Sequence, residues 1–444
     1  MMRVTRGTRM SAGIVMALVA VLLTACSSLL DVTDPDLINP GNVNNPDGAI
    51  AAYNGAIGDF AFANDGDNGG TEGQILVTGV MTDEYFDSET FPTRIEYDSR
   101  AINENNGTLT TVFFNLQKAR VAAEGAAAAL QQYAPTPTAR IGEMLNLAGF
   151  TYVYFAENYC SAVPFSQRQP DGSIQYGTPL STTQILDRAI ASFDAAIAAT
   201  TDANQLAFAA VGKGRALLDK GDYAGAATAV ANVTATFKYQ TFHSASTDRQ
   251  KNGVFAFNNQ APNGTGRFSV ADVEGTNGLN FRAAADPRVV TVLNGKGFDN
   301  ISPLYILQKY TANTSPVNVA DGLEARLIRA EAALHGGTPS AAVDTLNAIR
   351  AASGLALAAL PDPGTQVGRE DLLFRERAFW LFATGHRLGD LRRLVRQYGR
   401  TASNVYPTGT YVKTGTAYGA NTELPVPFDE RNNPNYTGCD YNTP

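Results

Sequence analysis

The 444-residue sequence has few of the residues that hold metals, and it lacks the common phosphate-binding and nucleophile motifs. It contains three His and three Cys, and no two His follow a His-x-x-x-His spacing. Zinc sites draw three or four ligands mainly from those residue types. No Gly-x-x-x-x-Gly-Lys-Ser/Thr loop and no Gly-x-Ser-x-Gly elbow is present. We therefore expect no metal, no cofactor and no catalytic residues.

Positive charge is also scarce. The chain has 34 Lys and Arg against 42 Asp and Glu, a formal net charge of −8, and no cluster of basic residues. A phosphate backbone repels such a chain, so nucleic acid is not an expected partner. Apolar residues nevertheless make up 44% of the sequence and charged residues 17%. This composition predicts a folded protein with a sizeable core.

No apolar run is long enough to span a membrane. The longest, residues 11–23, follows three arginines and falls short of the roughly 20 residues that a span needs. Leu23-Thr24-Ala25-Cys26 comes next and resembles the bacterial lipobox. We expect a signal peptide over residues 1–25, a lipid on Cys26 and an extended tether over 26–47. The alternative is an ordinary secretory peptide in which Cys26 is incidental.

Export leaves two other cysteines to consider. An exported chain meets an oxidising environment, where thiols pair. With Cys26 modified, Cys160 and Cys439 are the two that remain. We expect a disulfide between them, and two free buried thiols are the alternative.

Helical periodicity dominates the rest of the chain. Apolar residues recur at helical spacing over residues 49–62, 109–133, 139–159 and 182–199. Two further segments carry small residues at matching offsets, Gly214 and Ala226 in one, Ala330 and Ala342 in the other. That spacing resembles the tetratricopeptide helix pair.

Three irregular stretches interrupt the helices, over residues 83–106, 235–320 and 401–444. The second is dense in Asn, Gly, Thr and aromatic residues. Long loops on a helical frame are typical of recognition proteins. We expect one helical domain over residues 48–444, with an irregular insert at about 235–320 as a candidate ligand-facing surface.

Three C-terminal segments carry a family resemblance. The run over residues 369–394 resembles the E-R-x-x-E-L-x-x-E-G-x-R-x-x-D-L-x-R signature of the SusD/RagB family of outer-membrane nutrient-binding lipoproteins, departing from it at Phe379-Trp380 and at Thr384. Residues 327–355 resemble the family's L-x-R-A-E-A and L-N-x-I-R-x-x-x-G-L pair, and Leu424-Pro425-Val426-Pro427 its C-terminal L-P-I-P.

The resemblance implies a mostly α-helical, SusD-like fold with tetratricopeptide-like helix pairs and long irregular loops. It implies a non-enzymatic protein, anchored by lipid to the outer membrane and exposed at the cell surface. Such a protein binds a soluble nutrient oligomer, with a glycan favoured, and delivers it to a SusC-type TonB-dependent transporter. Two alternatives from other classes are a surface glycan hydrolase and a tetratricopeptide scaffold that binds only protein.

Sugar capture needs flat apolar faces beside hydrogen-bonding side chains. The first irregular stretch offers that mixture, in the region from which the family draws part of its ligand contacts. The candidate ligand-binding residues are Asp83, Glu84, Tyr85, Phe86, Phe91 and Arg94. A weaker candidate surface comprises Phe255, Phe257, Asn258, Asn259 and Arg267. The alternative is that these aromatic residues fix the loops onto the scaffold.

The charged residues of the family signature have a structural interpretation. Glu376, Arg377, Arg387 and Asp390 are expected to form a partly buried ion-pair network that fixes a helix pair. Arg387 and Asp390 stand three residues apart and can meet on one helix face. Trp380, within the same motif, is expected to lie in the core.

Overall fold

The computed structural model of the protein describes residues 44–441, apart from 170 and 260–265. The predicted signal peptide, Cys26 and most of the tether lie outside the described residues. The helices are α2 (Pro46–Asp65), α3 (Gln74–Met81), α4 (Pro92–Asp98), α5 (Gly107–Tyr133), α6 (Thr138–Asn158), α7 (Thr182–Ala199), α8 (Ala203–Asp219), α9 (Tyr223–Ala229), α10 (Gly253–Asn259), α11 (Gly322–Leu334), α12 (Ser340–Ala352), α13 (Gln366–Trp380), α14 (Arg387–Arg396) and α15 (Ala402–Val405), with 3-10 turns η2 (Asp248–Gln250) and η3 (Phe428–Asn432). None of the described helices has the length and apolar character required to cross a membrane.

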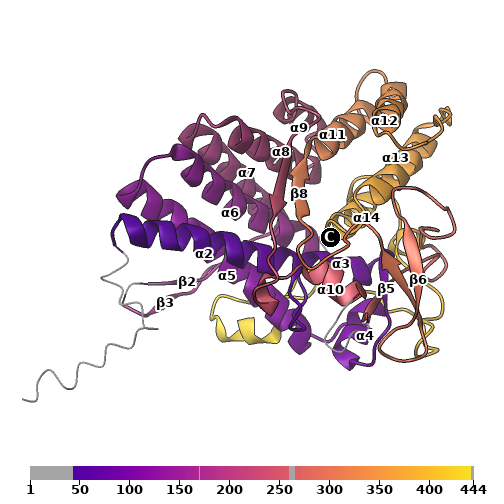
Figure 1. The fold of residues 1–444 in the computed structure, drawn as a ribbon, viewed down its shortest axis with the longest axis horizontal. Coiled ribbons are helices and arrows are strands. Elements are labelled where there is room, and N and C mark those ends of the chain that lie inside the picture. The colour runs from indigo at the N-terminus through magenta and orange to yellow at the C-terminus, as the bar shows by residue number, and fades with distance from the viewer. Residues whose placement is uncertain (1–43, 170, 260–265, 442–444) are drawn as a thin grey trace, which may run out of the picture.

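Long helices form one side of the molecule, the left-hand side of Figure 1, where α6 packs against α5 and α7, and α2 packs along α5. Their bounds agree closely with the predicted ranges. Local sequence sets their starts. The Asn45 side chain accepts a hydrogen bond from the Gly48 N–H and Pro46 opens α2. Ser181 and Gln184 form a reciprocal capping box on α7.

The two predicted helix pairs are present as α8–α9 and α11–α12. The small residues at their matching offsets permit close packing. A Cβ added at Gly214 would lie 2.6 Å from Val230 of the same pair and 3.3 Å from Ile328 of the other. Ala226, Ala330 and Ala342 are all buried. The pairs are far apart in sequence, yet α11 packs against both α8 and α9, so each covers apolar surface that the other could not bury alone.

The strands are short and pair in twos within the described chain. They are β1 (Tyr85–Asp87) with β5 (Phe268–Val270), β2 (Gln167–Arg168) with β3 (Ile174–Gln175), β4 (Lys238–Thr241) with β8 (Val317–Asp321), and β6 (Thr291–Lys296) with β7 (Pro303–Leu307), all antiparallel. The β1–β5 pair joins the first irregular stretch to the second. In its register Tyr85 faces Val270 and Asp87 faces Phe268.

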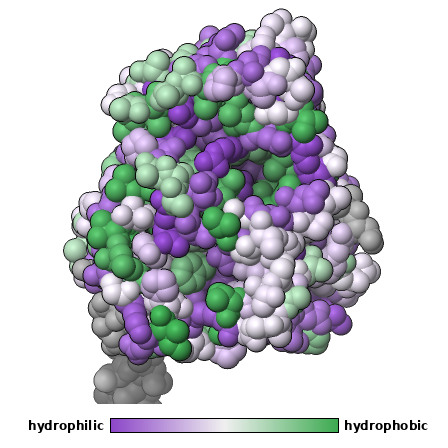
Figure 2. Space-filling view, turned by 90° about the vertical axis from the view of Figure 1, so that its right-hand side faces the viewer, coloured by the Kyte–Doolittle hydropathy of each residue, from purple (hydrophilic) through white to green (hydrophobic). Residues whose placement is uncertain are grey.

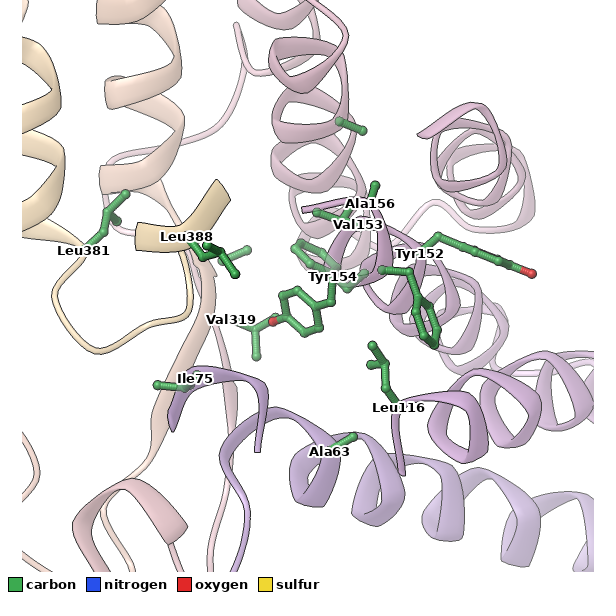
Figure 3. Close-up of a cluster of buried hydrophobic side chains, with 14 of the residues drawn as sticks. Ala63, Ile75, Leu116, Tyr152, Val153, Tyr154, Ala156, Val319, Leu381 and Leu388 are labelled. Carbon is green, nitrogen blue, oxygen red and sulfur yellow. The ribbon is translucent and has the colours of Figure 1, made fainter. Parts of the chain in front are cut away.

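Aromatic side chains fill the core between the helices. Phe150 stacks on Phe208 with ring centroids 4.6 Å apart and meets Phe193 edge-on at 5.3 Å. Tyr154, at the centre of Figure 3, points from α6 toward Val319 of β8. Its hydroxyl donates to the Asn64 side-chain oxygen at 2.9 Å. Because the hydroxyl has this hydrogen-bond partner, a tyrosine can occupy a position otherwise lined by apolar groups.

Cys160 and Cys439 are joined by a disulfide across 279 residues. The bond attaches the C-terminal segment to the end of α6. Backbone hydrogen bonds reinforce the attachment, because the Cys160 N–H donates to the Leu424 carbonyl at 2.9 Å and the Leu424 N–H donates to the Asn158 carbonyl at 2.8 Å.

The predicted ion-pair network is buried, but its partners differ from those predicted. Asp390 pairs with Arg377 at 2.8 Å and with Arg393 at 2.7 Å. Burial raises the pKa of Asp390, but these two cations overcome that effect and hold the pKa below its usual range. The expected Arg387–Asp390 pair is wrong, since the Arg387 guanidinium binds Asp83 from outside the helix.

Glu376 joins α13 to two other segments through its carboxylate. It accepts hydrogen bonds from Arg288 at 2.8 Å and from Arg350 of α12 at 2.7 Å. All three side chains are largely buried. The network therefore connects α13 to α12 and to the second irregular stretch, in addition to fixing the α13–α14 turn.

Candidate functional site

The structure places most of the predicted ligand-binding residues inside the protein. Asp83, Glu84, Tyr85 and Arg94 are each at most 3% exposed, while Phe86 is half-buried and Phe91 is 47% exposed. As direct ligand contacts the four buried residues are a correction to the sequence analysis, because their polar groups already have protein partners or no route to solvent. Of the six, Phe91 presents the largest free surface.

Partners from the C-terminal part of the chain hold the first half of this loop. Asp83 accepts two hydrogen bonds from Arg387, and Glu84 accepts one from the Ala383 N–H at 2.9 Å. Burial raises the pKa of Glu84 to about 8. The Tyr85 ring lies 5.7 Å from the Phe382 ring, centroid to centroid. The alternative considered from the sequence, an aromatic residue fixing the loop to the scaffold, therefore describes Tyr85.

Arg94 supports the exposed ring of Phe91. Its guanidinium forms ion pairs with Glu72 and Glu89 and donates to the Gly70 carbonyl at 2.9 Å. The same group lies 5.0 Å from the centroid of the Phe91 ring and 5.0 Å from that of Phe257. The cation thus sits between an exposed ring and a buried one.

The second predicted surface is also mostly interior. Phe255, Phe257, Asn258 and Arg267 are at most 7% exposed, and Asn259 is half-buried. The Asn258 side chain donates to two backbone carbonyls and accepts the Leu307 N–H at 2.7 Å. As an open binding surface this set is a correction, because its amide and aromatic groups are used to hold β5 and β7 together.

The two predicted segments nevertheless meet around Glu89. Glu89 pairs with both Arg94 and Arg267, and so ties one stretch to the other. The Arg267 guanidinium lies 5.4 Å from the Phe91 ring centroid and 4.3 Å from that of Phe298. We call Phe91, Arg267 and Phe298 the Phe91 platform. Sequence reasoning missed Phe298, because nothing in the irregular insert marks it as a neighbour of Phe91.

Apolar side chains project from the loops beside the platform. The Lys413 ammonium lies 3.3 Å from carboxylate oxygens of both Asp87 and Asp299, bringing the third irregular stretch to the end of β1. Next to those residues, Val412 is 77% exposed and Ile301 is 79% exposed. Figure 2 shows the side of the molecule that carries β5 and β6, with apolar patches set among hydrophilic ones and a hollow above them. Exposed apolar groups gathered on loops are typical of a binding surface.

The platform presents an exposed ring on an ordered support. An exposed ring backed by fixed guanidinium groups offers a flat face for stacking at little entropic cost, since its supports are already ordered. Across the described residues, no group of three or more His, Cys, Asp or Glu side chains is arranged to hold a metal ion.

Trp380 is not in the core, contrary to the expectation from the sequence. It is half-buried at the end of α13 and lines two surface hollows. Its indole N–H donates to Glu376 at 3.2 Å, and the Arg288 guanidinium lies 4.8 Å from its ring centroid. The ring is therefore held in place while part of its surface remains free.

Comparison with protein families identifies the C-terminal part of the chain. Residues 324–438 match the sequence model of the SusD family. Over these residues the match confirms the resemblance to the SusD/RagB family that the sequence motifs predicted. A comparison with curated protein sequences finds no match.

Solved structures share the fold over most of the chain. A SusD superfamily protein from Bacteroides vulgatus is 16% identical, with a TM-score of 0.64, covering 88% of this chain and 97% of its own. A laminarin-binding SusD-like protein is 13% identical, with a TM-score of 0.65 and coverage of 89% and 99%. Surface glycan-binding protein A from Bacteroides uniformis is 14% identical, with a TM-score of 0.66 and coverage of 88% and 99%. At these identities the likeness concerns the fold, which is SusD-like and mostly helical as predicted.

Proposed function

We propose that this protein captures oligosaccharides, with the Phe91 platform as the principal contact. The observation that carries the proposal is a phenylalanine ring that is 47% exposed while the guanidinium groups of Arg94 and Arg267 behind it are fixed by Glu89. A ring held in this way can stack on a sugar ring without first being ordered. Two proteins of similar fold, a laminarin-binding SusD-like protein and a surface glycan-binding protein, support a glycan over other ligands.

The cellular setting is part of the proposal. The lipobox-like segment ending at Cys26 supports a lipid anchor, and the family relationship supports a position on the outer surface of the outer membrane. In that position the protein would pass its ligand to a SusC-type TonB-dependent transporter. The resemblance to the SusD family supports a role in binding without turnover.

A glycan hydrolase has less support. Hydrolysis needs two carboxyl groups beside the substrate, one of them with a raised pKa. Burial raises the pKa of Glu274 to about 7 and that of Asp98 well above its usual range. However, these residues are 8% and 2% exposed, and they accept hydrogen bonds from Tyr418 and Tyr411. Buried carboxyl groups in such contacts have no access to a glycosidic bond.

Titration calorimetry and a cleavage assay test the proposal together. The full chain, in a detergent without sugar groups, is titrated with laminari- and malto-oligosaccharides while the same mixtures are analysed for products. Saturable binding without cleavage supports capture, and cleavage contradicts it. Binding of a transporter in the absence of any saccharide affinity would favour the tetratricopeptide scaffold.

A further inference from the structure

A cleft on another part of the molecule carries features that the platform does not use. Two adjoining hollows, of about 270 and 390 Å³, share Trp380 and Lys309 as lining residues. The first lies where β4 and β8 meet the turn between α13 and α14. The second continues along the other side of the two shared residues. We call the two hollows together the Trp380 cleft. Its parts approach or fall within the range of about 300–1,000 Å³ that is usual for ligand sites.

The acidic groups that line the cleft are already engaged. Asp321 caps α11 by accepting the Glu324 N–H at 2.8 Å, and its second oxygen accepts from Asn318 at 2.9 Å. The Glu324 carboxylate lies 3.1 Å from the His386 ring nitrogen. The charge of Glu324 is thus directed into the protein framework, whereas Asp321 also attracts the Lys309 ammonium across the cleft.

Two lysines of the cleft are less committed. The Lys309 ammonium donates one hydrogen bond, to the Phe382 carbonyl at 2.7 Å, and an ammonium has three N–H groups to donate. Lys238 is exposed and lines the first hollow. The third cation of the cleft, Arg288, is held by Glu376 and Asp286. The cleft therefore presents available positive charge beside an indole ring, although the whole chain is acidic.

We propose that the Trp380 cleft is a second binding site, specific for a sugar unit that bears a carboxylate. The sugar ring stacks on Trp380, and its carboxylate accepts hydrogen bonds from Lys309 and Lys238. Aromatic stacking uses the apolar face of the ring, and the ammonium groups distinguish an acidic unit from a neutral one. The site is separate from the Phe91 platform and does not depend on ligand binding there.

The chain provides its own reporter for this site, because Trp380 is its one tryptophan. The full chain, in a detergent without sugar groups, is titrated with trigalacturonate while tryptophan emission is recorded. We expect a saturable change in emission with trigalacturonate. The affinity for maltotriose should be at least about tenfold lower, since the neutral sugar cannot accept charge-assisted hydrogen bonds.

Substitutions of the two lysines test the contribution of each ammonium group separately. Lys309→Met is expected to weaken trigalacturonate binding roughly ten- to hundredfold, the range for a lost hydrogen bond to a charged group. Lys238→Ala, an exposed and fold-neutral change, is expected to weaken it about two- to fivefold. The matched control is Lys296→Ala, which lies at the far end of the β6–β7 hairpin that leads to Lys309. This variant should bind trigalacturonate with the affinity of the parent protein.

The outcomes are distinct from those that test the platform. Phe91→Ala should leave the emission titration unchanged. No emission change with trigalacturonate, while calorimetry detects neutral oligosaccharides, overturns the second site and leaves the proposed function intact. Equal affinity for trigalacturonate and maltotriose overturns the acidic specificity. A response to an acetylated diglutamate peptide and to neither sugar would overturn the saccharide class.

Discussion

The guanidinium of Arg387 holds the carboxylate of Asp83 in two parallel hydrogen bonds, Nε to Oδ1 at 2.6 Å and Nη2 to Oδ2 at 2.8 Å. Both side chains are buried, and 304 residues separate them in sequence. The bond fixes the start of the loop that leads to Phe91 onto the first turn of α14. Through it, a residue of the family signature positions the candidate binding surface.

Replacing Asp83 with alanine is expected to destabilise the fold by about 3–5 kcal/mol, because Arg387 would remain buried without its partner. The Leu279 N–H would also lose its acceptor. Chemical denaturation measures the loss. Asp371→Ala, which removes an exposed partner of Arg400, is the control and should change stability by less than about 1 kcal/mol. Unchanged stability with lost saccharide affinity would instead make Asp83 a ligand contact.

The buried carboxyl group of Glu84 predicts a pH dependence. Its pKa is about 8 in the folded protein because of burial, against 4.5 ordinarily. Its contribution to stability is therefore complete below pH 4.5 and is lost as the pH rises toward 8. Glu84→Gln should remove this dependence, making the variant relatively more stable at pH 8 by up to roughly 4 kcal/mol.

Thermal unfolding of the Glu84→Gln variant and the parent at several pH values between 4.5 and 8 measures the difference. Glu104→Gln, an exposed substitution, serves as the control and should give a curve parallel to that of the parent. A constant difference between Glu84→Gln and the parent across this range would contradict the expectation.

The disulfide should contribute substantially to stability. The chain-entropy model gives about 6 kcal/mol as an upper bound for a bond closing 279 residues between Cys160 and Cys439. Reduction, or a Cys439→Ser change, is expected to lower the free energy of unfolding by a large part of that amount. Denaturation with and without reductant measures it, and thiol titration of the denatured, unreduced chain should count neither cysteine as free.

The exposed ring of Phe91 should matter for binding and little for folding. Phe91→Ala is expected to weaken oligosaccharide affinity about tenfold or more, as loss of one stacking contact does, with stability changed by less than about 1 kcal/mol. Phe428→Ala is the matched control, since Phe428 is 43% exposed and lies on η3. Calorimetry compares the three proteins, and equal affinities would exclude the platform as the site.

Local sequence patterns determined much of the fold. Helical periodicity located the long helices, because the spacing of apolar residues is a property of each segment by itself. The small residues at Gly214 and Ala330 marked the helix pairs for the same reason. The pairing of Cys160 with Cys439 followed from counting, once Cys26 was assigned to the lipid.

Local sequence patterns could not predict which charged side chains are buried. The first irregular stretch mixes aromatic and charged residues, and nothing in the spacing distinguishes Arg94, which is enclosed by Glu72 and Glu89, from Phe91 on the surface. Likewise, Trp380 and Thr384 stood out in the sequence as departures from the family signature, and the structure shows that both line the same hollow.

The sequence by itself thus determined the helical class, the helix pairs, the family resemblance and the pair of cysteines, since each rests on short-range spacing or on composition. Tertiary structure decided which face of each irregular stretch meets solvent. That choice depends on ion pairs such as Asp83–Arg387 and Glu89–Arg267, whose members lie 304 and 178 residues apart in sequence. A buried charge must find its partner wherever the fold places it, and only the folded chain shows which residues are left to bind a ligand.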